Sequence, residues 1–104
     1  MDRRIRLKDE EIEIIKEVAI EIFGEDAKVY IFGSRVDLTK KGGDIDIFIE
    51  TQKEVSLNQE IDFLAKLELK GIERSVDVLI KAKNRDNKPI FEEAKRTGVL
   101  IESF

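Results

Sequence analysis

Cysteine and histidine are both absent from this sequence of 104 residues. Their absence excludes disulfides, thiolate nucleophiles, zinc sites of the usual kind and acid/base chemistry by imidazole. Any chemistry carried out by this chain must therefore depend on carboxylates, hydroxyls or cations.

A long apolar run is also absent. The first residues, MDRRIRLKDEE, contain no apolar core of signal-peptide length, and no window approaches the length of a membrane span. We therefore expect a cytoplasmic protein without a membrane partner.

An excess of positive charge is missing as well, because 23 acidic residues outnumber 19 basic ones and the net charge is −4. This balance argues against bulk binding of nucleic acid, although a local basic patch stays open. With 41% hydrophobic and 40% charged residues, the chain is expected to form one compact domain over residues 1–104.

Apolar periodicity divides the chain into alternating helical and extended segments. A Ser-x-x-Gln capping box at Ser56 and a proline at position 89 both suit the first turn of a helix. The order of segments predicts an α/β fold with a small mixed β-sheet and helices packed on one face. The predicted helices are Asp9–Phe23, Ser56–Lys70 and a segment from Pro89 to Gly98; the predicted strands are Ala27–Phe32, Asp44–Glu50, Ser75–Lys81 and an edge strand Val99–Ile101.

Aspartates stand inside two of the predicted strands, where this residue is disfavoured. In the segment GGDIDIFIE, Asp44 and Asp46 project to one side about 7 Å apart, while the isoleucines between and after them face the core. Asp77 would complete a cluster of three carboxylates if its strand is a neighbour in the sheet.

Each aspartate taken alone is more simply explained as a solvent-facing residue of an amphipathic strand. Three of them are harder to explain in this way, and Phe48 on the same face argues against open water. Carboxylates without histidine or cysteine select Mg²⁺ or Mn²⁺, and three can hold two ions about 4 Å apart. Such sites serve phosphoryl and nucleotidyl transfer.

A second motif, Gly33-Ser34-Arg35, follows the first predicted strand directly. Glycine permits close approach of a ligand, and the backbone N–H groups and hydroxyl at Ser34 could contact a phosphate, with Lys40 and Lys41 nearby in sequence. Gly-Ser after a strand is more often a plain turn, and the chain has no P-loop pattern. The prediction of a phosphate site therefore depends on the combination with the aspartates.

The combination of Phe-Gly-Ser-Arg at 32–35, Gly-Gly-Asp-Ile-Asp-Ile at 42–47 and a strand aspartate at 77 resembles the DNA polymerase β-like nucleotidyltransferase superfamily. The chain looks most like the minimal nucleotidyltransferases, stand-alone proteins often paired with a HEPN-domain partner. This resemblance implies a fold like the polymerase β palm. Two features depart from the commonest pattern: Gly43 replaces a frequent serine, and the loop between the motifs is short.

The resemblance also implies the roles of the motif residues. Asp44, Asp46 and Asp77 would be catalytic and bind two Mg²⁺ ions, with Asp77 positioned to activate the attacking hydroxyl. Gly33 and Ser34 would hold the β- and γ-phosphates of an NTP donor, expected to be ATP, and Arg35 belongs to the same nucleotide-binding motif.

The implied function is transfer of a nucleoside monophosphate to a hydroxyl of a partner, as in a toxin-antitoxin pair whose toxin is a HEPN ribonuclease. A non-catalytic antitoxin with a vestigial metal site is the alternative, and an RNA- or DNA-binding module is disfavoured by the acidic balance. Apolar residues of the second predicted helix are interpreted as core, with a protein interface as the alternative. These residues are Ile61, Phe63, Leu64, Leu67 and Leu69.

Overall fold

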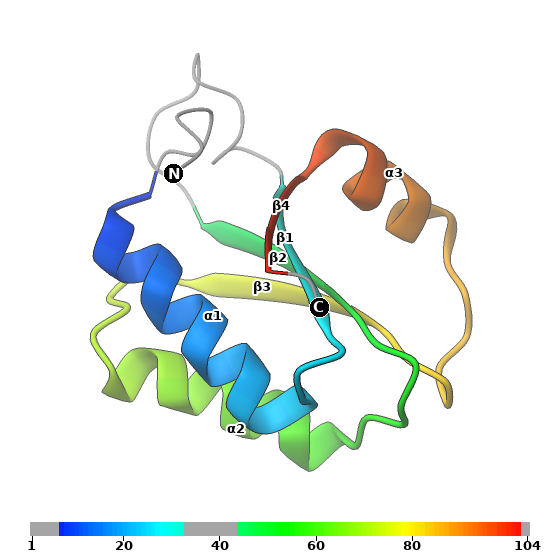
Figure 1. Cartoon of the computed structure of the whole chain (residues 1–104), viewed down its shortest axis with the longest axis horizontal. Coiled ribbons are helices and arrows are strands. Elements are labelled where there is room, and N and C mark those ends of the chain that lie inside the picture. The colour runs from blue at the N-terminus through cyan, green and yellow to red at the C-terminus, as the bar shows by residue number, and fades with distance from the viewer. Residues whose placement is uncertain (1–6, 33–43, 103–104) are drawn as a thin grey trace.

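The computed structural model describes residues 7–32 and 44–102. Every predicted helix and strand is present, in the predicted order (Figure 1). The elements are α1 (Asp9–Phe23), β1 (Lys28–Phe32), β2 (Ile45–Glu50), α2 (Leu57–Leu69), β3 (Val76–Lys81), α3 (Pro89–Thr97) and β4 (Val99–Glu102).

The strands form one four-stranded sheet in the order β3-β2-β1-β4. β1 runs antiparallel to both β2 and β4, whereas β2 and β3 are parallel. Parallel neighbours need a crossover connection, and α2 provides it between β2 and β3. The predicted mixed sheet and the predicted edge strand at the C-terminal end are both confirmed.

Local signals in the sequence fix the helix ends. The Ser56 side chain accepts a hydrogen bond from the Gln59 backbone N–H at 3.1 Å, and the Gln59 side chain accepts one from the Ser56 N–H at 2.9 Å. This reciprocal pair satisfies two N–H groups that would otherwise lack a partner at the start of α2. Pro89 stands in the first turn of α3, and Gly24 ends α1 with φ at 97°.

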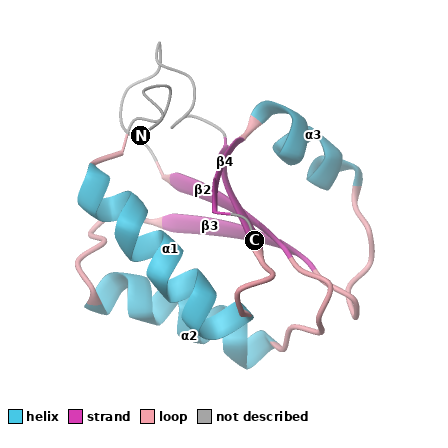
Figure 2. Cartoon of the chain, in the orientation of Figure 1, coloured by secondary structure: helices cyan, strands magenta, loops and turns pink. Residues whose placement is uncertain are grey.

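One face of the sheet is covered by α1 and α2, as Figure 2 shows. The isoleucines of β2 pack there against α1 and α2, and the rings of Phe23 and Phe63 lie 5.2 Å apart. The apolar residues of α2 divide between core and surface. Phe63 and Leu67 are buried, whereas Ile61 and Leu69 are 53% and 84% exposed.

The opposite face is covered by α3, so the expectation that all helices lie on one face holds for α1 and α2 only. Phe91 and Ala94 of α3 form a second buried cluster with Tyr30 and Phe48, whose side chains alternate with the isoleucines that face α1 and α2. The physical reason is Phe48: a phenyl ring on the second face of a central strand needs cover from water, and α3 provides it.

Among the helices of the described residues, none combines the length and the apolar content that crossing a membrane requires.

Candidate active site

The carboxylates of two predicted site residues stand next to each other in the sheet. Asp46 of β2 and Asp77 of β3 are register partners on parallel neighbouring strands. Such partners lie about 4.8 Å apart along the hydrogen-bonding direction, with their side chains on the same face. The condition set by the sequence, that the two strands be neighbours, is therefore met.

Phe32 extends this row to a third strand, because it is the register partner of Asp46 on β1. The row Phe32, Asp46, Asp77 crosses the sheet at the end where β2 and β3 begin. The sequence had drawn attention to Phe32 only as the residue before Gly33. Its place beside Asp46 depends on antiparallel pairing, which apolar periodicity does not reveal.

Asp44 lies one residue before the start of β2 and is exposed, whereas Asp46 is half-buried and Asp77 is exposed. Within the described residues, no three acidic side chains are gathered closely enough to form a ready-made metal cage. The structure therefore brings Asp46 and Asp77 together and leaves Asp44 at the rim. The metal-binding roles of all three aspartates stay a prediction.

An aromatic cluster adjoins the carboxylates on the same sheet face. Phe48, two residues beyond Asp46, is 0% exposed and stacks on Phe91 of α3 at 5.4 Å, and the centre of the Tyr30 ring lies 5.6 Å from that of Phe48. Phe32 and Leu79 pack against this cluster. The site thus has one wall of low dielectric constant, which strengthens electrostatic interactions at its boundary.

At the other end of this sheet face, Glu50 forms ion pairs with two lysines. Its carboxylate lies 3.3 Å from Lys95 of α3 and 3.7 Å from Lys81 of β3. The hydrogen bond to Glu50 raises the pKa of Lys95 above its usual value. Burial raises the pKa of the neighbouring Tyr30, and the charge of Glu50 adds to that rise. These contacts tie α3 to the sheet beyond the aromatic cluster.

The donor set fits a hard divalent cation. Asp46 and Asp77 offer carboxylate oxygens from adjacent strands, and Asp44 offers a third carboxylate two residues from Asp46. Oxygen ligands of this kind suit Mg²⁺ and Mn²⁺, while the absence of histidine and cysteine from the chain disfavours zinc. Adjacent like charges also repel unless a cation lies between them.

The other predicted site residues are Gly33, Ser34 and Arg35, and they lie outside the described residues, as do Lys40, Lys41 and Gly43. Their predicted roles in binding the phosphates of a nucleotide stay predictions.

Comparison with protein-family models matches residues 13–103 to the family described as Polymerase beta, Nucleotidyltransferase. The chain belongs to this family. The matched region contains both strands that carry the aspartates. A search of curated proteins found no significant match. The four-stranded mixed sheet with three helices is consistent with a polymerase β-like nucleotidyltransferase fold. The general chemistry suggested for this nucleotidyltransferase domain is therefore transfer of a nucleotidyl group.

Proposed function

We propose that this domain transfers a nucleoside monophosphate, with ATP as the donor, to a hydroxyl group of a partner protein, and that it needs Mg²⁺ to do so. The observation that carries the proposal is the register of Asp46 with Asp77. Two carboxylates on one face of adjacent strands could act together as ligands of a divalent cation, which favours their charged forms.

The reaction is a displacement at the α-phosphorus of the nucleotide. The acceptor oxygen forms a new bond to this phosphorus, the bond from the phosphorus to the oxygen that bridges to the β-phosphate breaks, and pyrophosphate leaves. The hydroxyl proton passes to the Asp77 carboxylate or through it to water. Asp77 suits this task because it is exposed and lies beside Asp46.

Asp44, Asp46 and Asp77 would hold the metal. Divalent ions held by these carboxylates would supply Lewis-acid stabilisation of the charge that develops at the phosphate. The chain itself contributes the orientation of these carboxylates, since the backbone of Asp46 and Asp77 is held by the ladder between β2 and β3. The aromatic wall at Phe48 keeps water away from one side.

A protein acceptor is favoured by the exposure of two of the three aspartates. Asp44 and Asp77 are exposed, so a hydroxyl on the surface of another protein can approach them without opening the fold. We propose a HEPN-domain ribonuclease as this partner and an antitoxin role for the present domain. The support is the combination of motif residues with the family membership.

Intact-mass spectrometry tests this proposal. The domain is mixed with a HEPN-domain protein, Mg²⁺ and each of the four NTPs in turn. We expect a nucleoside-monophosphate adduct on the partner that is absent with Asp46→Asn/Asp77→Asn. A matched control is Asp62→Asn, which removes an exposed carboxylate on α2 outside the site. Equal adduct formation by the double variant would remove the proposed site.

The second candidate function is a non-catalytic antitoxin that neutralises its partner by forming a complex. The open arrangement of the acidic side chains in the described part of the chain favours it, because they form no ready-made cage. A stable complex without any adduct, under all four NTPs, would support this alternative against the enzyme.

A further inference from the structure

Ser75 places a hydroxyl beside the aspartates of the candidate site. The N–H of Ile45 donates to the carbonyl of Ser75 at 2.9 Å, so the parallel ladder between β2 and β3 continues one residue beyond the start of β3. The register pairs Asp46 with Asp77. Continued two positions toward the start of both strands, the same register places Ser75 opposite Asp44. Because Ser75 precedes Asp77 by two residues, their side chains lie on the same face of the sheet.

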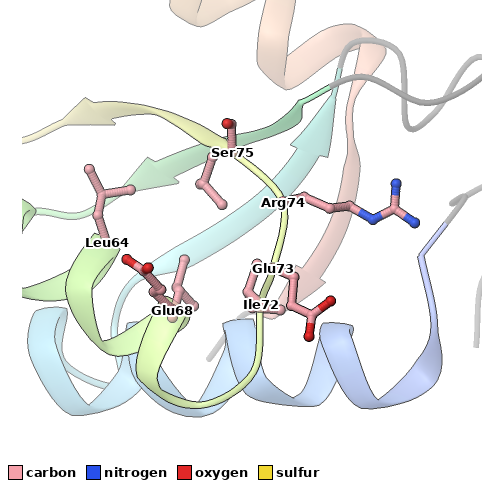
Figure 3. A pocket seen from close by; sticks show the side chains of 8 residues that line it. Leu64, Glu68, Ile72, Glu73, Arg74 and Ser75 are labelled. Atoms are coloured by element: carbon pink, nitrogen blue, oxygen red, sulfur yellow. The ribbon is translucent and has the colours of Figure 1, made fainter.

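The Ser75 hydroxyl is accessible to another molecule. Ser75 is exposed, and its side chain makes no hydrogen bond to any residue that the structure describes. Ser75 borders a hollow of about 510 Å³ beside α2, and in Figure 3 its hydroxyl points away from Leu64 and Glu68, which line the same hollow. This direction agrees with the register, because α2 covers the sheet face opposite to the aspartates.

The other hydroxyl side chains of the described residues lie elsewhere and are already engaged or buried. Hydrogen bonds within the fold hold the hydroxyls of Thr51, Ser56 and Thr97. Tyr30 is 7% exposed and belongs to the aromatic cluster. Within the described part of the chain, Ser75 is therefore the hydroxyl that could react at the aspartates.

We propose that Ser75 is itself an acceptor, so that the domain transfers a nucleoside monophosphate from a nucleoside triphosphate to the Ser75 hydroxyl of the same chain. This inference rests on the proposed function, because it uses the same donor and the same aspartates. Ser75 Oγ forms a bond to the α-phosphorus, the bond from this phosphorus to the oxygen that bridges to the β-phosphate breaks, and pyrophosphate leaves. The hydroxyl proton passes to the Asp77 carboxylate or through it to water. The product is a phosphodiester between Ser75 and the nucleoside.

Proximity favours this internal acceptor. A serine hydroxyl is a weak nucleophile that needs an adjacent base, and the Cα atom of Asp77 lies about 7 Å from that of Ser75 along the strand. An acceptor held in the chain avoids the entropic cost of bringing a second molecule to the site. A nucleotide on Ser75 would occupy the space that a partner hydroxyl must enter, so the two acceptors exclude each other on one chain.

Intact-mass spectrometry of the purified chain alone, with Mg²⁺ and each of the four NTPs in turn, tests the inference. We expect one nucleoside-monophosphate adduct, which peptide mapping assigns to Ser75. The adduct should be lost in Ser75→Ala and kept in Ser75→Thr, which retains a hydroxyl, and in the matched control Thr97→Ala. Its rate per chain should not depend on protein concentration. An adduct that persists in Ser75→Ala, or a rate that rises in proportion to concentration, would overturn the inference.

A binding measurement separates an acceptor from a metal ligand. Mn²⁺ binding is followed by calorimetry with an ATP analogue whose α- and β-phosphates are joined by a methylene group, so that no transfer occurs. Wild type and Ser75→Ala should bind equally, because an acceptor hydroxyl is no ligand of the ion. Loss of binding in Ser75→Ala would assign the hydroxyl to the metal site instead and contradict the acceptor role.

The assay with the HEPN-domain protein, run in parallel, separates this inference from the proposed function. An adduct on that protein with none on the wild-type chain, in the presence or absence of the partner, would overturn the inference and leave the proposed function standing. An adduct on neither protein would contradict both.

Discussion

Asp46 and Asp77 occupy partner positions on adjacent parallel strands, although α2 and its connections separate them in the sequence. Like charges directly opposite in a sheet are destabilising. Within the same two strands, the other partner positions include apolar pairs such as Ile47 with Val78 and the oppositely charged pair Glu50 with Lys81. The acidic pair therefore differs from the other partner positions of this ladder, and departures of this kind from the usual pairing are expected at functional sites.

Replacing both carboxylates should separate activity from stability. Asp46→Asn/Asp77→Asn keeps side-chain volume and leaves the apolar core unchanged, so we expect an unfolding free energy within about 1 kcal/mol of the wild type. Nucleotidyl transfer should fall to background. Urea unfolding followed by circular dichroism, together with the adduct assay, checks both parts. A large loss of stability would instead assign the pair a structural role.

The packing of α3 on the second face of the sheet should depend on the contact between Phe91 and Phe48. Phe91→Ala removes a ring that is buried and stacked on Phe48 at 5.4 Å. We expect a loss of about 3–5 kcal/mol in unfolding free energy. Leu69→Ala, at a position 84% exposed, is the matched control and should change stability by no more than about 0.5 kcal/mol. Equal effects of the two changes would show that α3 does not pack as described.

Gly98 should tolerate no side chain, because α3 turns into β4 at this point through a close approach of backbone atoms. A Cβ atom here would lie 2.5 Å from the carbonyl oxygen of Ala94 and 3.1 Å from that of Ile31. The residue has φ of −80°, so space rather than conformation requires glycine. Gly98→Ala should lower the unfolding free energy by about 1–3 kcal/mol. Thr97→Ala, at the exposed neighbouring position, controls for local helix effects; a Gly98→Ala variant as stable as the wild type would contradict this geometry.

The ionisation of Tyr30 can be followed directly, because the chain contains one tyrosine and no tryptophan. Burial raises the pKa of its hydroxyl above the usual value of 10.0. Absorbance at the tyrosinate band should therefore give a midpoint above 10.0. The denatured chain in urea provides the reference, and a midpoint at or below that reference would refute the burial of the hydroxyl.

The raised pKa of Tyr30 also determines how the free energy of unfolding changes at alkaline pH. The folded state holds the Tyr30 and Lys95 protons more tightly than the unfolded chain, since both pKa values are raised. Stability should therefore be full below the unfolded pKa values, near 10, and fall as the pH rises through the folded ones. Tyr30→Phe should flatten part of this fall, as measured by urea midpoints on both sides of the tyrosine transition.

The helices and strands could be predicted from the sequence because each is marked by residues within it or next to it. The capping box at Ser56 and the proline at position 89 mark the same helix starts in the structure. The parallel pairing of β2 with β3 could not be derived from periodicity, since pairing partners are distant in the chain. The position of α3 was also missed, although Phe48 among the aspartates carried the signal that the second face of the sheet is covered.

The sequence also predicted part of the candidate site. Alternation predicted that Asp44 and Asp46 share a face, which stays a prediction, and the condition that the Asp77 strand be a neighbour was met by the structure. Phe32 was missed as a neighbour of Asp46 because its position follows from the antiparallel register of β1. The division of α2 between core and surface was missed as well, because Ile61 and Phe63 are equally apolar and differ only in the direction in which the helix turns them.

The most direct test of the metal and nucleotide site is Mn²⁺ binding by isothermal titration calorimetry, with and without ATP. The account predicts saturable binding that ATP strengthens, lost in Asp46→Asn/Asp77→Asn and kept in Asp62→Asn. Binding of the same strength in the double variant, or no binding by the wild type even with ATP present, would contradict the claim that Asp46 and Asp77 form the centre of a nucleotidyltransferase site.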